Sequence, residues 1–179
     1  MMTATNHALT DFEIDPVTGF LPALDPLRSL PAEFAAWDAL GADLPALLLA
    51  HQARNRLAHM PLLDVDHLAG AAERERAMLL LSTFAGAYVW GEAEPAKRLP
   101  PALAVPLWQI SERLGRKPII SHASNVLHNW RRLDPDGPRT LENLAMLQGF
   151  LWSSDEAWFV LVTVAIEACG AMRTSIELP

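Results

Sequence analysis

Histidine is the most versatile functional residue type in this sequence, because imidazole serves both as a metal ligand and as an acid or base near neutral pH. The chain contains six histidines, namely His7, His51, His59, His67, His122 and His128. No two of them are four residues apart, the spacing that places two imidazoles on one face of a helix. His122 and His128 are six apart and point to nearly opposite sides of a helix. We therefore expect no metal site built from these side chains alone.

Other local motifs of catalysis are missing from the sequence. It has no P-loop, no paired CxxC, no GxSxG and no glycine-rich dinucleotide turn. The spacing of the Ser, His and Asp residues does not exclude a catalytic triad, and nothing in the sequence favours one. Cys169 is the single cysteine, which excludes a disulfide framework and fits a reducing compartment.

The apolar run from Ala157 to Ile166 carries one hydroxyl, that of Thr163, with Phe159 one turn earlier on the same helix face. Because the run is apolar on every face, it predicts a helix buried at the centre of the fold. Two interpretations of Thr163 stay open: a pocket residue, or a core residue whose hydroxyl bonds back to a main-chain carbonyl. Glu167 lies one turn further on. An unpaired buried carboxylate is costly, so we expect a salt bridge there.

The elements that must position these residues are predicted to be helices throughout, because no stretch alternates like a strand. Capping residues set several ends: Asp43 and Thr140 as N-caps, Gly91 and Gly115 as stops, and Ser153 with Glu156 as a capping box. The fold class is therefore all-α. The predicted helices cover residues 33–40, 43–57, 66–90, 101–114, 121–132, 140–151 and 153–172.

The proline-rich residues 1–30 are predicted to form an extended N-terminal arm with turns. The best break between domains is the loop at 134–139, rich in Pro, Asp and Gly. We expect a small helical domain over 31–138 and the first helices of a larger domain over 139–179.

The composition of the chain limits the classes of binding partner that we expect. The chain has 179 residues, 51% hydrophobic and 20% charged, with a net charge of −7 and a pI near 5.3. Nucleic acids require clustered Lys and Arg, and the sequence has only short basic pairs such as Arg131-Arg132, so no nucleic-acid role is expected. The first residues do not form a secretory signal, and the most apolar run is too short to span a bilayer. We expect a soluble cytoplasmic chain.

Several segments, taken in order, resemble the N-terminal half of the indoleamine 2,3-dioxygenase family. They are GFLP (19–22), Leu44-Pro45, PLLDVDHL (61–68), AYVWG (87–91), the run from 99 to 138 with its LAVP and NWRRLDP segments, and FVLVT (159–163) with Glu167. The resemblance implies the N-terminal part of that helical fold. It also implies haem b, with dioxygen as co-substrate, and cleavage of the indole C2–C3 bond of tryptophan, or a related indole, to N-formylkynurenine.

The resemblance also implies the walls of a substrate and haem pocket. The family pattern Phe-Phe-Leu-Val-Ser corresponds here to residues 159–163, so Phe159 matches the aromatic beside the indole, Val160 replaces a second aromatic, and Thr163 matches the hydroxyl near the bound ligand. The animal pattern Tyr-Ala-Asp-Cys-Val-Leu corresponds to residues 122–127. His122 and Asn125 stand in place of tyrosine and cysteine, while Val126 is retained, which makes this pocket more polar.

The family's proximal haem histidine lies further along than Pro179, and no histidine here matches it. The resemblance therefore implies a partner: a C-terminal half, on the same or another chain, without which we expect no turnover. The alternative is a non-catalytic or degenerate helical module that docks on another chain. Either case predicts an exposed apolar patch where haem and the remaining domain would lie.

Overall fold

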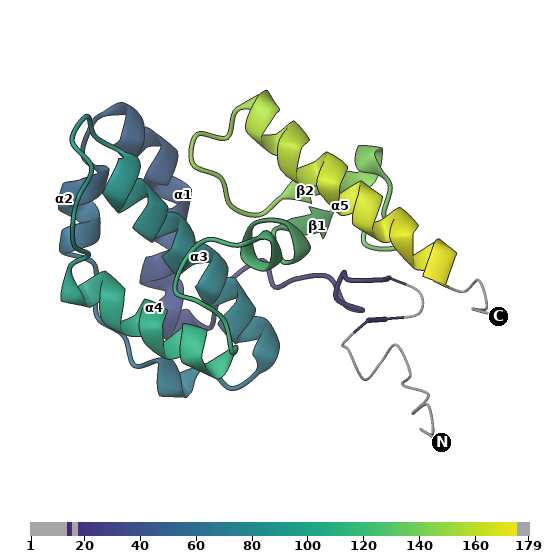
Figure 1. The fold of residues 1–179 in the computed structure, drawn as a ribbon, viewed down its shortest axis with the longest axis horizontal. Coiled ribbons are helices and arrows are strands. Elements are labelled where there is room, and N and C mark those ends of the chain that lie inside the picture. The colour runs from purple at the N-terminus through teal and green to yellow at the C-terminus, as the bar shows by residue number, and fades with distance from the viewer. Residues whose placement is uncertain (1–13, 16–17, 175–179) are drawn as a thin grey trace, which may run out of the picture.

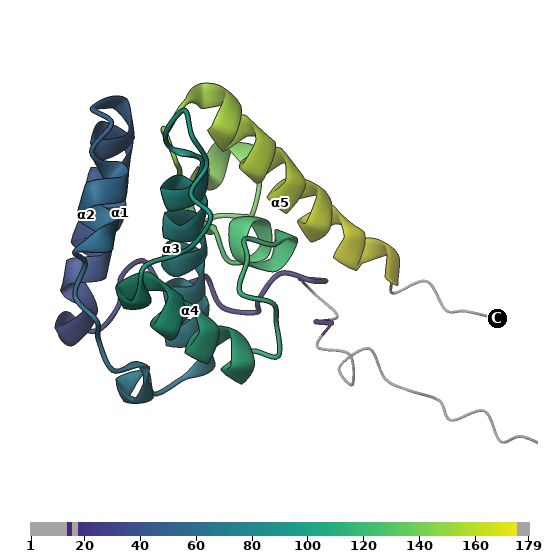
Figure 2. The ribbon, with the colours of Figure 1, turned by 60° about the vertical axis from the view of Figure 1, so that its left-hand side comes forward.

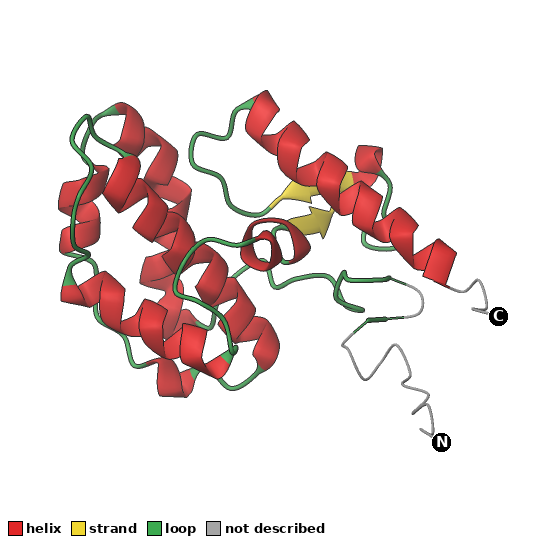
Figure 3. Ribbon diagram, in the orientation of Figure 1, coloured by secondary structure: helices red, strands yellow, loops and turns green. Residues whose placement is uncertain are grey.

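The fold was obtained as a computed structural model that describes residues 14–15 and 18–174. Its described part is mostly helical (Figure 3), as the sequence predicts, with one antiparallel two-stranded sheet. The helices and strands, labelled in Figure 1, are α1 (Ala35–Leu49), α2 (Ala53–Ala58), α3 (Ala71–Trp90), α4 (Pro101–Arg113), β1 (Trp130–Arg132), β2 (Leu144–Met146) and α5 (Ser154–Thr174). The described residues also form four short helical turns, one before α1 and three between later elements: η2 (Ala32–Phe34), η3 (Val65–His67), η4 (Ala123–Leu127) and η5 (Leu141–Asn143).

The larger core surrounds α3. Residues 75–85 of this helix are buried on every side, and α1, α2 and α4 pack around it. Trp37, Phe34, Leu57, Leu103 and Ile110 meet α3 there with almost no exposed surface. Gly115, at φ +63, follows the end of α4 in the left-handed conformation that favours glycine.

Helix α1 continues through Pro45, which has no N–H to donate to the carbonyl of Gly41. The side-chain amide of Gln148 donates to that carbonyl instead, at 3.1 Å. Gly41 permits this approach, because a Cβ there would lie 2.6 Å from Oε1 of Gln148. The predicted helix start at Asp43 is therefore wrong: a distant side chain replaces the hydrogen bond that proline removes.

A smaller core lies under α5. Val160 and Val164 of α5 pack against Val126, Trp130 and the sheet, and all of these side chains are buried. Figure 2 shows α5 along one side of the molecule, with α3 and η4 on its inner side. The indole of Trp130 is fixed by donation to the carbonyl of Leu127 at 2.9 Å.

Asn129 joins the two cores. Its side chain is fully buried, accepts from the backbone N–H groups of Leu147 and Gln148, and donates to the carbonyl of Gln148. Since Gln148 in turn reaches Gly41 of α1, a chain of buried hydrogen bonds runs from one core to the other.

The predicted helices at 121–132 and 140–151 are wrong. The first is only the turn η4, closed by a bond from the N–H of His128 to the carbonyl of Ala123 at 3.0 Å, and it leads into β1. The second is the turn η5 followed by β2. The strands pair Trp130 with Met146, and burial of both side chains against α5 outweighs local helix preference.

The predicted helix at 66–90 begins later than expected, at Ala71, because Asp64 caps the separate turn η3. The capping prediction for α5 is confirmed: the N–H of Glu156 donates to Oγ of Ser153 at 3.1 Å. The Glu156 carboxylate also accepts from the backbone N–H groups of Phe150, Leu151 and Trp152.

The predicted arm at 1–30 lies partly outside the described residues. From Thr18 to Leu30 the chain forms turns and irregular structure, and Asp25 accepts from the guanidinium of Arg132 at 2.9 Å. The division at 134–139 stays a prediction. That loop connects β1 to β2, so the two strands of the sheet come from either side of it.

Candidate functional site

The outer face of α5, made of Trp158, Phe159, Thr163 and Ile166, is exposed and apolar except for one hydroxyl. Trp158, Phe159 and Ile166 are 62%, 66% and 63% exposed. The prediction of a centrally buried helix is therefore wrong, because no described element covers this face. An exposed apolar patch was expected, and this is where it lies.

The inner face of α5 contains one predicted site residue, Val160. It is 1% exposed and packs in the smaller core with Val126, which is 2% exposed. Both side chains therefore act as core residues in this structure. They fix α5 against η4, one layer beneath the surface.

The hydroxyl of Thr163 donates to the carbonyl of Phe159 at 2.8 Å. This is the back-bonded arrangement that the sequence offered as one of two interpretations. The hydroxyl oxygen keeps its acceptor capacity, since the bond uses only its hydrogen. Thr163 is half-buried beside Phe159 on the outer face.

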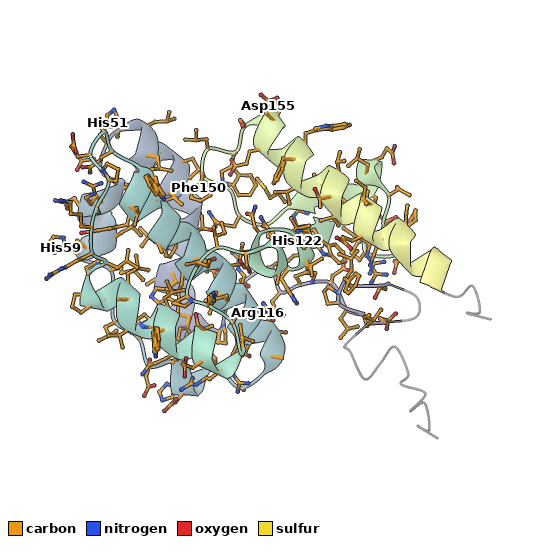
Figure 4. All side chains as sticks on the ribbon, viewed as in Figure 1. His51, His59, Arg116, His122, Phe150 and Asp155 are labelled. Carbon is orange, nitrogen blue, oxygen red and sulfur yellow. The ribbon has the colours of Figure 1, made fainter. Side chains whose placement is uncertain are left out.

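His122 lies where η4 meets α5 (Figure 4), and its Nε2 is 3.0 Å from Oε1 of Glu167. The expected partner of Glu167 is thus a residue of the candidate site. Glu167 follows Thr163 by one helical turn, so His122 borders the outer face of α5. Asn125 is half-buried on η4, and its backbone N–H donates to the carbonyl of Ser121 at 2.8 Å.

The structure thus brings the six predicted residues onto two touching segments, η4 and α5. His122, Asn125, Phe159 and Thr163 have exposed or half-buried side chains, whereas Val126 and Val160 lie beneath them. The partnership of His122 with Glu167 was not foreseen. Their separation of 45 residues leaves no sequence signal.

A partly buried ionic group that the sequence did not reveal lies at the C-terminal end of η4, where His128 is the cap residue. The guanidinium of Arg116 binds the carboxylate of Glu75 through two bonds of 2.6 and 2.7 Å. Nε2 of His128 lies 3.6 Å from the same carboxylate. Burial lowers the pKa of His128. The negative charge of Glu75 opposes this shift, and the positive charge of Arg116 adds to it. His128 is therefore a neutral imidazole at neutral pH.

The aromatic and aliphatic outer face of α5 suits a flat apolar macrocycle such as haem. Within the described ranges, no three His, Cys, Asp or Glu side chains come close enough together to hold a metal ion. His122, which borders that face, is held by Glu167.

Over the described ranges, no helix is long and apolar enough to cross a membrane.

Comparison with known proteins gives a consistent result. The chain is 38% identical over 167 residues to indoleamine 2,3-dioxygenase 2 of Homo sapiens, covering 92% of this chain and 41% of that protein. It is 37% identical over 176 residues to an indoleamine 2,3-dioxygenase of Aspergillus nanangensis, covering 95% and 43%. A protein of Haliotis diversicolor named myoglobin is 35% identical over 162 residues, covering 89% and 40%.

The chain therefore spans about two fifths of the length of these relatives. The family model of indoleamine 2,3-dioxygenase matches residues 8–177, which is nearly the whole sequence. The chain therefore belongs to the indoleamine 2,3-dioxygenase family.

Proposed function

We propose that this chain forms the substrate-side wall of a haem-dependent dioxygenase that cleaves the indole C2–C3 bond of L-tryptophan, or a related indole, to N-formylkynurenine. One observation carries the proposal: in a member of this family, α5 presents an uncovered aromatic, Phe159, beside a single hydroxyl, Thr163. The single cysteine and the family favour a cytoplasmic enzyme of tryptophan breakdown.

In this proposal Phe159 holds the indole by contact between aromatic rings, an arrangement that gains from both area and ring geometry. Thr163 offers its oxygen as an acceptor at the edge of the same space. His122 and Asn125 form the polar side of the pocket, and Glu167 fixes the orientation of the imidazole. The surrounding apolar side chains exclude water from the reacting ring.

Haem, when bound, supplies the chemistry that activates dioxygen. Trp158 and Ile166, exposed on the same helix face, would offer the macrocycle apolar contact. The iron ligand and the other wall would come from a C-terminal portion corresponding to the remaining three fifths of the relatives. The chain alone is therefore expected to produce no N-formylkynurenine.

Complementation tests the proposal directly. Residues 1–179 are co-expressed with the C-terminal three fifths of the Aspergillus nanangensis relative, and each part is also expressed alone. We expect a haem Soret band and N-formylkynurenine from L-tryptophan, under reducing conditions, only when both parts are present. A folded, haem-loaded pair that produces nothing from tryptophan or other indoles would overturn the proposal, as would turnover by residues 1–179 alone.

A second candidate is a non-catalytic module that docks on another chain. The match to a protein named myoglobin supports it, because that name is not the name of a dioxygenase. The two candidates differ in one result of the same experiment: a haem-loaded pair that forms no product from any indole supports the second.

A further inference from the structure

A groove of about 450 Å³ runs along β2, with Arg131 of β1 in its lining, and the lining contains none of the six candidate site residues. Its volume is within the range of small-molecule sites. The side chains that matter to the argument come from five segments: Arg28, Arg131, Leu144, Met146, Trp152 and Leu161.

Two arginines of this groove have no carboxylate partner among the residues that the structure describes. Arg131 makes no side-chain hydrogen bond or ion pair there, in contrast to its neighbour Arg132, which binds Asp25. Arg28 donates one N–H to the carbonyl of Arg132 at 2.9 Å and keeps other donors free. Unpaired guanidinium groups beside an apolar wall stand out in a chain of net charge −7. They favour an anionic ligand.

Trp152 provides a second, independent observation. Its backbone has φ +55, a left-handed conformation that is uncommon and costly for an aromatic residue. The conformation is held by Glu156, whose carboxylate accepts from the N–H of Trp152 at 2.9 Å. The bend leaves the indole 47% exposed at the groove, so the apolar wall includes a flat aromatic surface.

The edge of β2 contributes free polar groups. The N–H of Leu133 donates to the carbonyl of Asn143, so in this antiparallel register Arg131 and Ala145 form the next directly bonded pair. The backbone groups of Leu144 and Met146 consequently point away from β1, toward the groove side.

We propose that this groove binds an aryl carboxylate, with the aromatic body against Trp152 and Leu161 and the carboxylate on Arg131 and Arg28. Planar guanidinium groups match the two oxygens of a carboxylate. The apolar wall selects a ligand with a flat hydrophobic body over a small inorganic anion. The site is separate from the outer face of α5 and does not depend on the proposed dioxygenase activity.

Binding to the whole chain tests this with a matched pair of ligands, indole-3-acetate and its neutral counterpart indole-3-acetamide, by calorimetry or NMR. We expect the acetate to bind at least about tenfold more tightly, because only it engages the arginines. Equal affinities would overturn the proposal. So would displacement of the acetate by an equal concentration of inorganic phosphate, which would indicate an anion site with no preference for aryl groups.

Variants locate the site. Arg131→Gln is expected to weaken acetate binding about tenfold, whereas Arg98→Gln removes the same charge from an exposed position outside the groove lining and leaves binding unchanged. Trp152→Gly removes the ring while tolerating φ +55, and it weakens both ligands. Leu62→Ala, at an exposed apolar position outside the groove lining, is expected to leave binding unchanged. Loss of binding in Phe159→Ala, with full binding in Arg131→Gln, would assign the ligand to the outer face of α5 and overturn the proposal.

Discussion

Nε2 of His122 lies 3.0 Å from Oε1 of Glu167, and this contact joins η4 to α5 at the border of the outer face. Both groups are partly exposed, so the bond contributes less to stability than to geometry. We expect His122→Phe to lower the free energy of unfolding by less than about 1 kcal/mol while amide exchange speeds up over residues 121–127. Hydrogen–deuterium exchange measures the second effect. Glu167→Gln, which keeps an acceptor oxygen, is the control, and unchanged exchange in His122→Phe would contradict a positioning role.

Phe159 and Val160 are neighbours in sequence with opposite environments, which makes them a matched pair. Phe159→Ala is expected to change the free energy of unfolding by no more than about 0.5 kcal/mol, because the ring is exposed. Val160→Ala removes buried methyl groups and is expected to cost about 2 kcal/mol. Chemical denaturation measures both. In the complemented enzyme, Phe159→Ala should weaken substrate binding, and unchanged affinity and turnover would remove Phe159 from the pocket.

Thr163 can be tested by separating its hydroxyl from its shape. Thr163→Val keeps the branched side chain and removes the donor to the carbonyl of Phe159, and Thr163→Ser keeps the donor. We expect both variants to fold with stability within about 1 kcal/mol of the parent. Turnover of the complemented enzyme should fall modestly in Thr163→Val and be retained in Thr163→Ser. Equal turnover in all three proteins would leave the hydroxyl with its structural bond alone.

Removal of one partner of the Glu75–Arg116 pair is expected to destabilise the fold. Glu75→Gln leaves the guanidinium without its charged partner in a mostly buried position, and we expect a loss of about 2–3 kcal/mol. Urea unfolding measures it. Glu92→Gln breaks the more exposed pair with Arg54 and serves as the control, with a loss below about 1 kcal/mol. Similar losses in the two variants would show that burial of Glu75 adds nothing.

His128 is expected to make the protein less stable in mild acid. Burial lowers its pKa in the folded state, so the unfolded chain binds the proton more readily. The contribution of His128 to the free energy of unfolding is therefore fully present above the ordinary histidine pKa of about 6.5. It is lost as pH falls from there toward the lowered pKa of the folded state. In that window the slope approaches about 1.4 kcal/mol per pH unit.

Unfolding measured between neutral pH and mild acid, in the parent and in His128→Gln, isolates this contribution. The variant should show a shallower dependence on pH. His67 behaves in the opposite sense, since Glu33 raises its pKa and its contribution is lost as pH rises. Equal slopes in parent and variant would contradict the burial argument.

The sequence predicted elements well where one local signal dominates. The prolines near 101, the glycine after residue 114 and the Ser153–Glu156 capping pair lie where the structure places helix ends. It failed where a distant partner decides the conformation. Pro45 stays inside α1 because Gln148, more than a hundred residues away, binds Gly41, and the segment after Asn129 is drawn into a strand by pairing with residues 144–146.

In the candidate site, too, some features could be predicted from the sequence and others depend on distant packing. Resemblance placed Phe159, Thr163 and His122 on adjoining segments, and the structure brings those segments together. Periodicity could not show which face of α5 is uncovered, because every face is apolar and exposure depends on what packs nearby. The ionic group of Glu75, Arg116 and His128 could not be predicted from the sequence, because its members lie on separate segments and only packing makes them neighbours.

The hydrogen bonds from Asn129 through Gln148 to Gly41 imply a single cooperative unfolding transition. These buried groups lose their hydrogen-bond partners if either core opens alone. The unsatisfied groups then destabilise the core that is still folded. Helical and sheet-side signals should therefore melt together in the same scan. The most slowly exchanging amides should include those of Leu147 and Gln148, in a loop, alongside the helical amides of α3.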